Sequence, residues 1–331
     1  MRFSSLLITG SSGFVGQALC PALQACGAKL HGLDTVPGGK ALASRAVGSI
    51  LDKKLVKQCL DGRDGIIHLA AAHKDFGVRA SEYYEINVEG TRTLLEAASE
   101  HGVKTFVFFS SVAVYSPSNS RNPIDEKGET KPLSDYGKSK LAAEQEVLKW
   151  GAAAPDRRAL IIRPTNIFGP GNLHNLYRLI RTLDKGHFVR VGKLNEVKSI
   201  VYIGNVVAAT IHLLLRPELQ HHTFNLVDEP SVSSWELIHQ ICSSGNFKLP
   251  RLSIPLTVAF PFGKLLDGLA VATGKDFPIT GKRIKKLNTP SHFSSAYLHK
   301  EGFSAPYSLE QGIANTVQWY LQNSVGESKA A

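Results

Sequence analysis

Short apolar and β-branched runs alternate with longer amphipathic stretches over the first two-thirds of the chain. The apolar runs predict strands over Ser5–Thr9, Lys29–Leu33, Gly65–Leu69, Thr105–Phe109 and Ala159–Arg163. The amphipathic stretches predict helices over Phe14–Cys26, Lys53–Leu60, Glu82–His101 and Tyr136–Lys149. Strands that alternate with helices are typical of a parallel sheet with helices on both faces. The pattern therefore predicts an α/β protein built on a doubly wound parallel sheet.

The alternation changes after Pro164, where loops rich in glycine, proline and asparagine separate the apolar segments. We expect a returning strand over Lys198–Ile203, a helix over Val206–Leu215 and a strand over Thr223–Val227. The chain then divides into a first domain, 1–170, completed by about 196–228, and a smaller mixed α/β domain. The smaller domain takes 171–195 and 229–321, and 322–331 are expected to form a flexible tail.

Composition limits the core, the redox chemistry and the partners. The chain has 331 residues, of which 43% are hydrophobic, so it can bury one large core or two. Its four cysteines, Cys20, Cys26, Cys59 and Cys242, show neither a paired spacing nor a metal-ligand spacing, so we expect no disulfide framework and no metal. The net charge of +10 favours phosphates, nucleic acid or an anionic membrane. No nucleic-acid module is present in the sequence, so we expect no nucleic-acid partner.

A glycine-rich loop joins the first predicted strand to the first predicted helix. Its glycines, Gly10, Gly13 and Gly16, follow a GxxGxxG spacing, which lets backbone amides and the positive helix end approach a pyrophosphate. This loop predicts a dinucleotide site formed by Gly10, Ser12, Gly13, Phe14, Val15 and Gly16. The first domain is then a nucleotide-binding Rossmann domain.

Asp34 ends the second predicted strand, 18 residues after Gly16. A carboxylate at this place can accept hydrogen bonds from both hydroxyls of the adenosine ribose, and it repels the 2′-phosphate of NADP. The alternative is that Asp34 only caps the loop that follows it. We expect NAD as the cofactor.

Tyr136 and Lys140 are four residues apart and therefore share one face of a predicted helix. A free tyrosine has a pKa of about 10 and is a poor base unless a nearby cation stabilises the phenolate. Ser111, after the strand Thr105–Phe109, can hydrogen-bond the reacting oxygen and relay a proton. A tyrosine and a lysine at this spacing are common in helices by chance. Together with the glycine loop, Ser110 and Asn87, they predict catalysis at an alcohol carbon by Ser111, Tyr136 and Lys140.

At these residues the chain resembles the extended short-chain dehydrogenase/reductase family, which contains NAD-dependent epimerases and dehydratases. The motifs that carry the resemblance include His68 to Ala71, the serine pair before Val112, and Arg163 to Asn166. The resemblance implies cofactor contacts from Ser49, Ile50, Leu69, Ala70, Ala71, His73, Asn87, Ser110, Tyr136, Lys140 and Pro164. It implies substrate contacts from Ser111, Val112, Asn166, Asn175, Leu176 and Lys198. It also implies a homodimer, formed through the helices Glu82–His101 and Tyr136–Lys149.

Departures from the family pattern narrow the expected reaction. Val112 and Ala113 stand where dehydratases of the family carry an Asp-Glu pair, so dehydration is not expected. Lys198 stands where UDP-sugar epimerases usually carry arginine, and a uridine-binding Arg-x-x-Asp motif is missing. The segments Lys198–Val206, Gly281–Leu287 and Ala305–Gly312 are similar to bacterial O-antigen epimerases that act on N-acetylhexosamine (GlcNAc or GalNAc) linked to polyprenyl diphosphate.

The resemblance therefore implies an NAD-dependent sugar 4-epimerase that works through a transient 4-keto sugar. A UDP-sugar 4-epimerase, a 4-keto-sugar reductase and a hydroxysteroid-type dehydrogenase remain alternatives, because all can use the same three catalytic groups. A redox-sensing or scaffold protein that binds NAD without catalysis is a further alternative, disfavoured by the intact catalytic set.

The location of the protein follows from two apolar segments. The apolar stretch Leu6–Ile8 is too short for a signal-peptide core, so we expect a cytoplasmic protein. Ile254–Ala272 is apolar but contains Pro255, Pro261, Lys264 and Asp267, so it cannot span a bilayer as a simple helix. It precedes the basic residues Lys275, Lys282, Arg283, Lys285 and Lys286. The segment either lies at a membrane surface or is a helix of the smaller domain, which binds the substrate, that packs on the core beside a solvated basic loop. Apart from His73, the histidines, including His221 and His222, are interpreted as surface residues.

Overall fold

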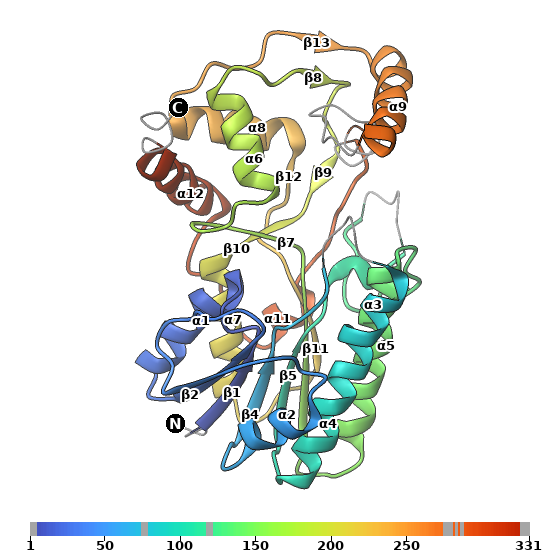
Figure 1. Cartoon of the computed structure of the whole chain (residues 1–331). Helices are drawn as coiled ribbons and strands as arrows, with labels where there is room; N and C mark the ends of the chain where they lie inside the picture. The colour runs from blue at the N-terminus through green and yellow to red at the C-terminus, as the bar shows by residue number, and fades with distance from the viewer. Residues whose placement is uncertain are drawn as a thin grey trace.

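The computed structural model describes residues 5–73, 79–116, 122–273, 281, 284 and 288–324. Its centre is a seven-stranded sheet with the strand order β11-β6-β5-β4-β1-β2-β3 (Figure 1). Every neighbouring pair of strands is parallel. This confirms the doubly wound parallel sheet expected from the sequence. The strands are β1 (Ser5–Thr9), β2 (Lys29–Asp34), β3 (Ser44–Val47), β4 (Gly65–His68), β5 (Thr105–Phe109), β6 (Arg158–Pro164) and β11 (Thr223–Leu226).

Helices cover both faces of this sheet. Alternate side chains of a strand point to opposite faces, so Leu6 and Ile8 pack in one core cluster while Leu7 packs in the other. The first cluster lies under α1 (Phe14–Ala25) and α7 (Ile203–Leu215). The second lies under α2 (Lys53–Leu60), α4 (Gly90–Glu100) and α5 (Asp135–Ala152) (Figure 1). Because the strands are parallel, their carboxyl ends all lie at one edge of the sheet. The glycine loop follows β1 and the serine pair follows β5 at this edge.

The predicted helix Glu82–His101 is broken into three elements. A short helix, α3 (Ala80–Tyr84), runs into a π-helical turn, η1 (Glu85–Glu89), before α4 begins. The turn contains Asn87, which is buried. Single π-helical turns inside helices often mark functional sites, because they redirect one side chain.

The second part of the chain occupies the upper half of Figure 1. It contains α6 (Asn175–Asp184), α8 (Ser234–Gly245), α9 (Leu256–Thr273), α12 (Leu309–Ser324) and the short pairs β8 (Arg190–Val191) with β13 (Ser253–Ile254) and β9 (Val197–Lys198) with β12 (Val232–Ser233). Side chains of α6, α8 and α12, among them Ile180, Ile241 and Val317, belong to the same core cluster as Leu6 of the sheet. The second part is therefore packed on the first through a continuous apolar core.

The chain crosses repeatedly between the two parts. After β6 it enters the upper part through β7 (Asn166–Phe168), which pairs with β10 (Ile200–Tyr202) just before α7 returns to the sheet. β11 closes the sheet, α8 lies in the upper part, and α11 (Ala296–Lys300) comes back beside β11 (Figure 1). α12 then ends the described chain in the upper part.

The strand predicted over Lys198–Ile203 is wrong in its extent. Ser199 interrupts it, because its backbone amide donates to the Ser291 carbonyl and its hydroxyl contacts Ser231 Oγ. β9 before the break pairs with β12, and β10 after it pairs with β7. The helix that follows begins at Ile203, earlier than predicted.

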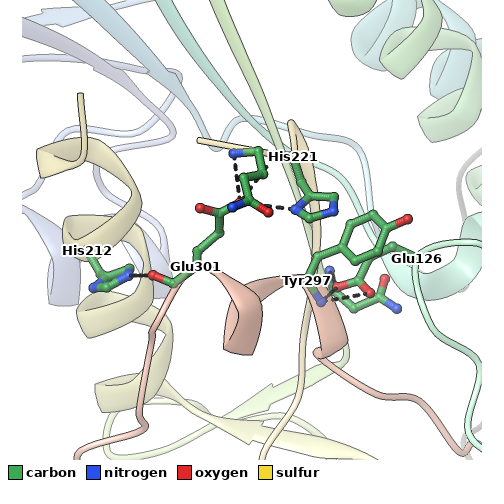
Figure 2. A network of polar contacts seen from close by, with 7 residues as sticks. Glu126, His212, His221, Tyr297 and Glu301 are labelled. Carbon is green, nitrogen blue, oxygen red and sulfur yellow. Dashed lines mark hydrogen bonds and ion pairs between the residues drawn. The ribbon is translucent and has the colours of Figure 1, made fainter. Parts of the chain in front are cut away.

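The interpretation of the histidines as surface residues is wrong for His31 and His68, which are 6% and 1% exposed, and for His221. Its Nδ1 lies 3.0 Å from Oε1 of the buried Glu301, and its ring stacks on Tyr297 with the centroids 3.7 Å apart (Figure 2). Glu301 also accepts the backbone amide of His221, and its carbonyl oxygen lies 3.0 Å from His212 Nε2. His222 is exposed.

Two expectations fall outside the described residues. They concern the basic cluster Lys275, Lys282, Arg283, Lys285 and Lys286 and the end of the expected tail, 325–331.

Candidate functional site

The glycine loop leaves β1 at Gly10, and α1 begins at Phe14. Gly10 has a φ of +69°, and a Cβ there would lie 2.7 Å from the Ala70 amide nitrogen. A Cβ on Gly16 would lie 2.6 Å from the Gly10 carbonyl oxygen. Both positions therefore require glycine. Gly13 precedes the helix and offers no side-chain cap, so the first-turn amides keep their capacity to bind an anion.

Asp34 lies beside this loop at the carboxyl end of β2. One carboxylate oxygen accepts the Ser12 amide at 2.9 Å, and the other accepts the Val36 amide at 3.1 Å. Asp34 thus also caps its loop, as the alternative interpretation held. Each carboxylate oxygen can accept a second hydrogen bond, so capacity for two ribose hydroxyls remains.

Asn87 joins the chain after β4 to the catalytic helix. Its side-chain oxygen accepts the Ala72 amide at 2.8 Å, and its side-chain nitrogen donates to the Ala72 carbonyl at 3.1 Å and to Ser139 Oγ at 2.9 Å. Ser139 in turn donates to the Tyr136 carbonyl. Asn87 therefore fixes the position of α5 relative to the loop after β4, Leu69 to Ala71, where cofactor contacts are expected.

The turn after Ser111 and the start of α5, which bears Tyr136, make a close backbone approach. Ser111 caps a 3-10 turn, η2 (Val112–Val114), where its Oγ accepts the Ala113 amide at 3.1 Å. A Cβ on Gly137 would lie only 2.3 Å from the Ala113 carbonyl oxygen, so α5 rests directly on this turn. Ser134 begins the helix by accepting the Gly137 amide at 3.0 Å. The Tyr136 ring packs edge-on against Tyr83.

Lys140 lies one turn further along α5 and is 1% exposed. Its Nζ is 4.1 Å from the centre of the Phe108 ring. Burial lowers the pKa of Lys140 from 10.5 to about 7, while the negative charge of Glu144 acts in the opposite direction. Burial also lowers the pKa of the neighbouring His68 to about 3, with a contribution from the Lys140 charge. The four-residue spacing puts Lys140 on the same face of α5 as Tyr136.

Sequence reasoning missed a buried polar network beneath the serine pair. Arg163 makes a two-pronged ion pair with Glu144, at 2.9 and 2.6 Å, and donates to the Tyr115 hydroxyl at 2.8 Å. The Tyr115 hydroxyl donates to Asn225 Oδ1 at 2.7 Å, and Glu126 accepts the Asn225 amide. The signal available in the sequence was the arginine within an apolar strand, which needs a buried partner.

The remaining cofactor candidates line the same edge of the sheet. Ser110 Oγ is buried and has no hydrogen-bond partner among the described residues. Ile50 packs against Gly90, Ser49 Oγ accepts the Leu51 amide, and His73 is exposed with Nδ1 near the Ala71 carbonyl. Pro164 ends β6. A dinucleotide fits three features of this edge. The N-terminus of α1 has no side-chain cap, Gly10 and Gly16 leave no room for a Cβ, and the Ser110 hydroxyl has no partner among the described residues.

The substrate candidates are more scattered. Val112 adjoins Ser111, and Asn166 and Asn175 are exposed where β7 and α6 begin. Lys198 Nζ donates to the Thr289 carbonyl. Leu176 packs in the main core, so its side chain stabilises the fold there.

A cavity of about 240 Å³ lies beside the 3-10 turn that follows Ser111. Its walls come from that turn, from the start of α5 and from the segment before α11; they include Ala113, Tyr115, Ile124, Ser134, His292 and Phe293. Apart from Ala113, the sequence analysis did not single out these wall residues, since they are brought together only by the return of the chain at 290–293.

Comparisons with known proteins agree with this geometry. Residues 6–226 match the family described as NAD dependent epimerase/dehydratase. The chain is 36% identical over 316 residues, 95% of both chains, to N-acetyl-alpha-D-glucosaminyl-diphospho-ditrans,octacis-undecaprenol 4-epimerase of Escherichia coli O157:H7. It is 28% identical, over 96% of both chains, to UDP-glucose 4-epimerase of Vibrio cholerae. The solved UDP-glucose 4-epimerase of Thermotoga maritima superposes with a TM-score of 0.76 at 20% identity, over 97% of this chain and 99% of that one.

Proposed function

This chain belongs to the NAD dependent epimerase/dehydratase family, and we propose that it is a sugar 4-epimerase acting on N-acetylhexosamine linked to polyprenyl diphosphate. One geometric observation carries the reaction type: the start of α5, which bears Tyr136, rests on the turn after Ser111, and Lys140 is buried one turn along. The E. coli relative supports the carrier, because its identity extends over nearly the whole of both chains.

Different residues of this chain carry out different parts of the alcohol oxidation. Tyr136 takes the proton from the sugar O4, because the Lys140 charge favours its phenolate. Ser111 hydrogen-bonds O4 and holds it toward Tyr136. Gly10 to Gly16 and Asp34 would hold NAD, which would supply the hydride acceptor and donor for C4. C4 is inverted when the hydride returns to the opposite face of the 4-keto sugar, and Tyr136 then gives the proton back to O4.

The turn after Ser111 favours epimerisation over dehydration. Elimination requires acid and base groups near the neighbouring sugar carbons, and Val112 and Ala113 offer none. A sugar that turns over between the two hydride transfers needs free space, which the cavity beside Ala113 provides.

The decisive experiment compares two donors of one sugar. Purified protein is incubated with polyprenyl-diphosphate-GlcNAc and, separately, with UDP-GlcNAc, and the released sugars are resolved chromatographically, with Tyr136→Phe as the inactive control. We expect GalNAc from the lipid-linked donor. Conversion of UDP-GlcNAc alone would indicate a UDP-sugar 4-epimerase, the activity in the name of the Vibrio relative. Net consumption of NADH or NADPH would indicate a reductase.

A lipid-linked substrate places the enzyme at the cytoplasmic membrane face. The surface for this contact is the apolar edge, which we define as Leu249, Leu252, Leu256 and Val258. Leu252 and Val258 are 61% and 62% exposed. The edge lies around β13 and the start of α9, at the end of the molecule far from the sheet (Figure 1).

Charge and packing near the apolar edge support a membrane contact there. Lys248 and Arg251 are exposed beside the apolar edge, and each cation near an anionic surface contributes about 1 kcal/mol. The other side of α9 packs through Ala259 on Val191, so both interpretations of this segment apply to different sides of one helix. Among the described helices, none has the length and apolar character needed to cross a bilayer.

Flotation with vesicles containing anionic lipid tests this contact. We expect the wild type to float in low salt and to be released by high salt. Leu252→Ser with Val258→Ser should reduce flotation, whereas Val47→Ser, which changes an exposed apolar residue on β3, should not. A wild type that stays unbound at low salt would contradict the membrane contact.

The homodimer forms through α4 and α5, which lie side by side on the outside of the sheet (Figure 1). Arg92 of α4 pairs with Glu146 of α5 at 3.1 Å, and Leu148 of α5 is 42% exposed. Light scattering after size exclusion should give a dimer for the wild type and a monomer for Leu148→Asp. Leu215→Asp, at an exposed apolar residue of α7, is the matched control. A monomeric wild type would contradict this assembly.

A further inference from the structure

A second cavity, of about 200 Å³, lies between the outer strands β2 and β3 and the helix α2. It is lined by His31, Ser44, Leu55, Gln58, Cys59 and Arg63, among others. The strand register pairs His31 with Ser44 near the start of both strands, and Arg63 precedes the start of β4. The cavity therefore lies toward the amino ends of the strands, opposite the edge that carries the glycine loop.

His31 is among the walls of this cavity, and one of its ring nitrogens has no hydrogen-bond partner among the described residues. The residue is only 6% exposed, and its Nδ1 lies 2.6 Å from Ser44 Oγ. Its Nε2 is buried without a hydrogen-bond partner among the described residues. A buried polar atom without a partner costs free energy, so it marks a place where a ligand gains a hydrogen bond. Where the Ser44 hydroxyl donates to Nδ1, the neutral ring carries its proton on Nε2 and presents a donor.

The charges around His31 are positive. Burial is the largest cause of a lowered His31 pKa, and the charges of Arg63 and Lys29 lower it further. Arg63 is held in place because its Nε donates to the Cys59 carbonyl and its Nη1 to Ser5 Oγ. No aspartate or glutamate is among the residues that line the cavity, all of which the structure describes. A site that collects cationic and donor groups without a carboxylate favours an anion.

We propose that this cavity binds a small phosphate-type oxyanion, which accepts a hydrogen bond from His31 Nε2 and faces the guanidinium of Arg63. The exposed Ser44 and Gln58 at its margin give an ion in solution access to these groups. The two sources of such chemistry are the free inorganic ion and the phosphate group of a small phosphomonoester. The site is separate from the catalytic edge and does not depend on the proposed reaction.

Histidine ring resonances, recorded during titration with inorganic phosphate, test the proposal. Saturating NAD is present throughout, so that the glycine loop is occupied and cannot account for the response. The His31 signal is identified by its loss in His31→Gln. We expect a saturable shift of this signal, while those of exposed histidines such as His222 stay in place. A parallel titration with glycerol phosphate distinguishes the two sources: a shift with phosphate alone assigns the free ion, and a tighter response to the ester assigns a phosphomonoester.

Variants of Arg63 provide the second part of the phosphate-binding test. Arg63→Met should weaken phosphate binding at least about 10-fold, and Arg63→Lys should restore part of it because the charge is kept. Lys54→Met removes an equal charge from the exposed side of α2 and should leave binding unchanged. If Arg63→Met does not fold, the titration of the wild type still shows whether the cavity binds phosphate. A His31 signal that does not respond to either anion, or a Lys54→Met variant that loses binding as Arg63→Met does, would overturn the proposal.

Discussion

Gly137→Ala should move Tyr136 away from the turn after Ser111 without replacing any catalytic side chain. A Cβ at this position would lie 2.3 Å from the Ala113 carbonyl oxygen, and ordinary contacts begin at 3.4 Å. The obstacle is backbone, so α5 must move away from the turn after Ser111 by roughly 1 Å, a displacement that can lower turnover about 100-fold. Overpacking of this kind also destabilises a fold by about 1–3 kcal/mol.

The assay measures kcat and KM for epimerisation, with NAD binding and thermal unfolding recorded for the same samples. We expect a large fall in kcat with NAD binding retained, since the glycine loop is far from Gly137 in the chain. Lys138→Ala is the matched control, because Lys138 is exposed on the same turn of α5. A folded Gly137→Ala enzyme with near-normal kcat would refute the reasoning that this glycine sets the approach of Tyr136 to Ser111.

Three further predictions concern single side chains. Tyr136→Phe should lower turnover at least about 100-fold with intact folding and NAD binding, because it removes a general acid/base, and near-normal turnover would exclude Tyr136 from the mechanism. Asp34→Ala and Asp34→Arg should relax the preference for NAD toward NADP, measured as the ratio of dissociation constants, and a wild type that prefers NADP would show the assignment to be wrong. Lys140→Met should abolish activity yet raise the melting temperature of the cofactor-free protein at pH 6. The pKa of Lys140 is lowered from 10.5 to about 7 in the fold, so the burial penalty is fully present below pH 7 and is relieved as pH rises toward 10.5. A lower melting temperature than that of the wild type at pH 6 would contradict this account of Lys140.

The sheet was predictable where strands are buried on both faces. β1 and β5 have five buried residues each, and such apolar runs stand out in the sequence. β3 was missed because it is a short edge strand, Ser44–Val47, whose residues are mixed in polarity and mostly exposed. The break at Ser199 could not be foreseen, because its partners lie at 231 and 291. α8, by contrast, carried a local signal that went unused: Ser233 and Glu236 form a capping box.

In the candidate site, too, the features fixed by neighbouring residues were predictable and those formed by distant residues were not. Local motifs suffice to find the glycine loop and the Tyr136–Lys140 pair, since strand, turn and helix fix their geometry within a few residues. The pairing of Asn87 with Ser139 and the partners of Arg163 needed the fold, because residues far apart in sequence form them. The resemblance implies a substrate contact for Leu176, whose side chain packs in the core; that contact stays a prediction.

The repeated crossings of the chain between the two parts bear on how this protein can be engineered. Neither part is a contiguous stretch of sequence, since β11 and α11 return to the sheet on either side of α8. A gene fragment that ends near residue 165 would encode a sheet without its outermost strand, β11, and without α7 over one face. Exchange of substrate preference between relatives therefore requires several coordinated splice points, and a single-junction chimera would expose apolar core on both sides of the cut.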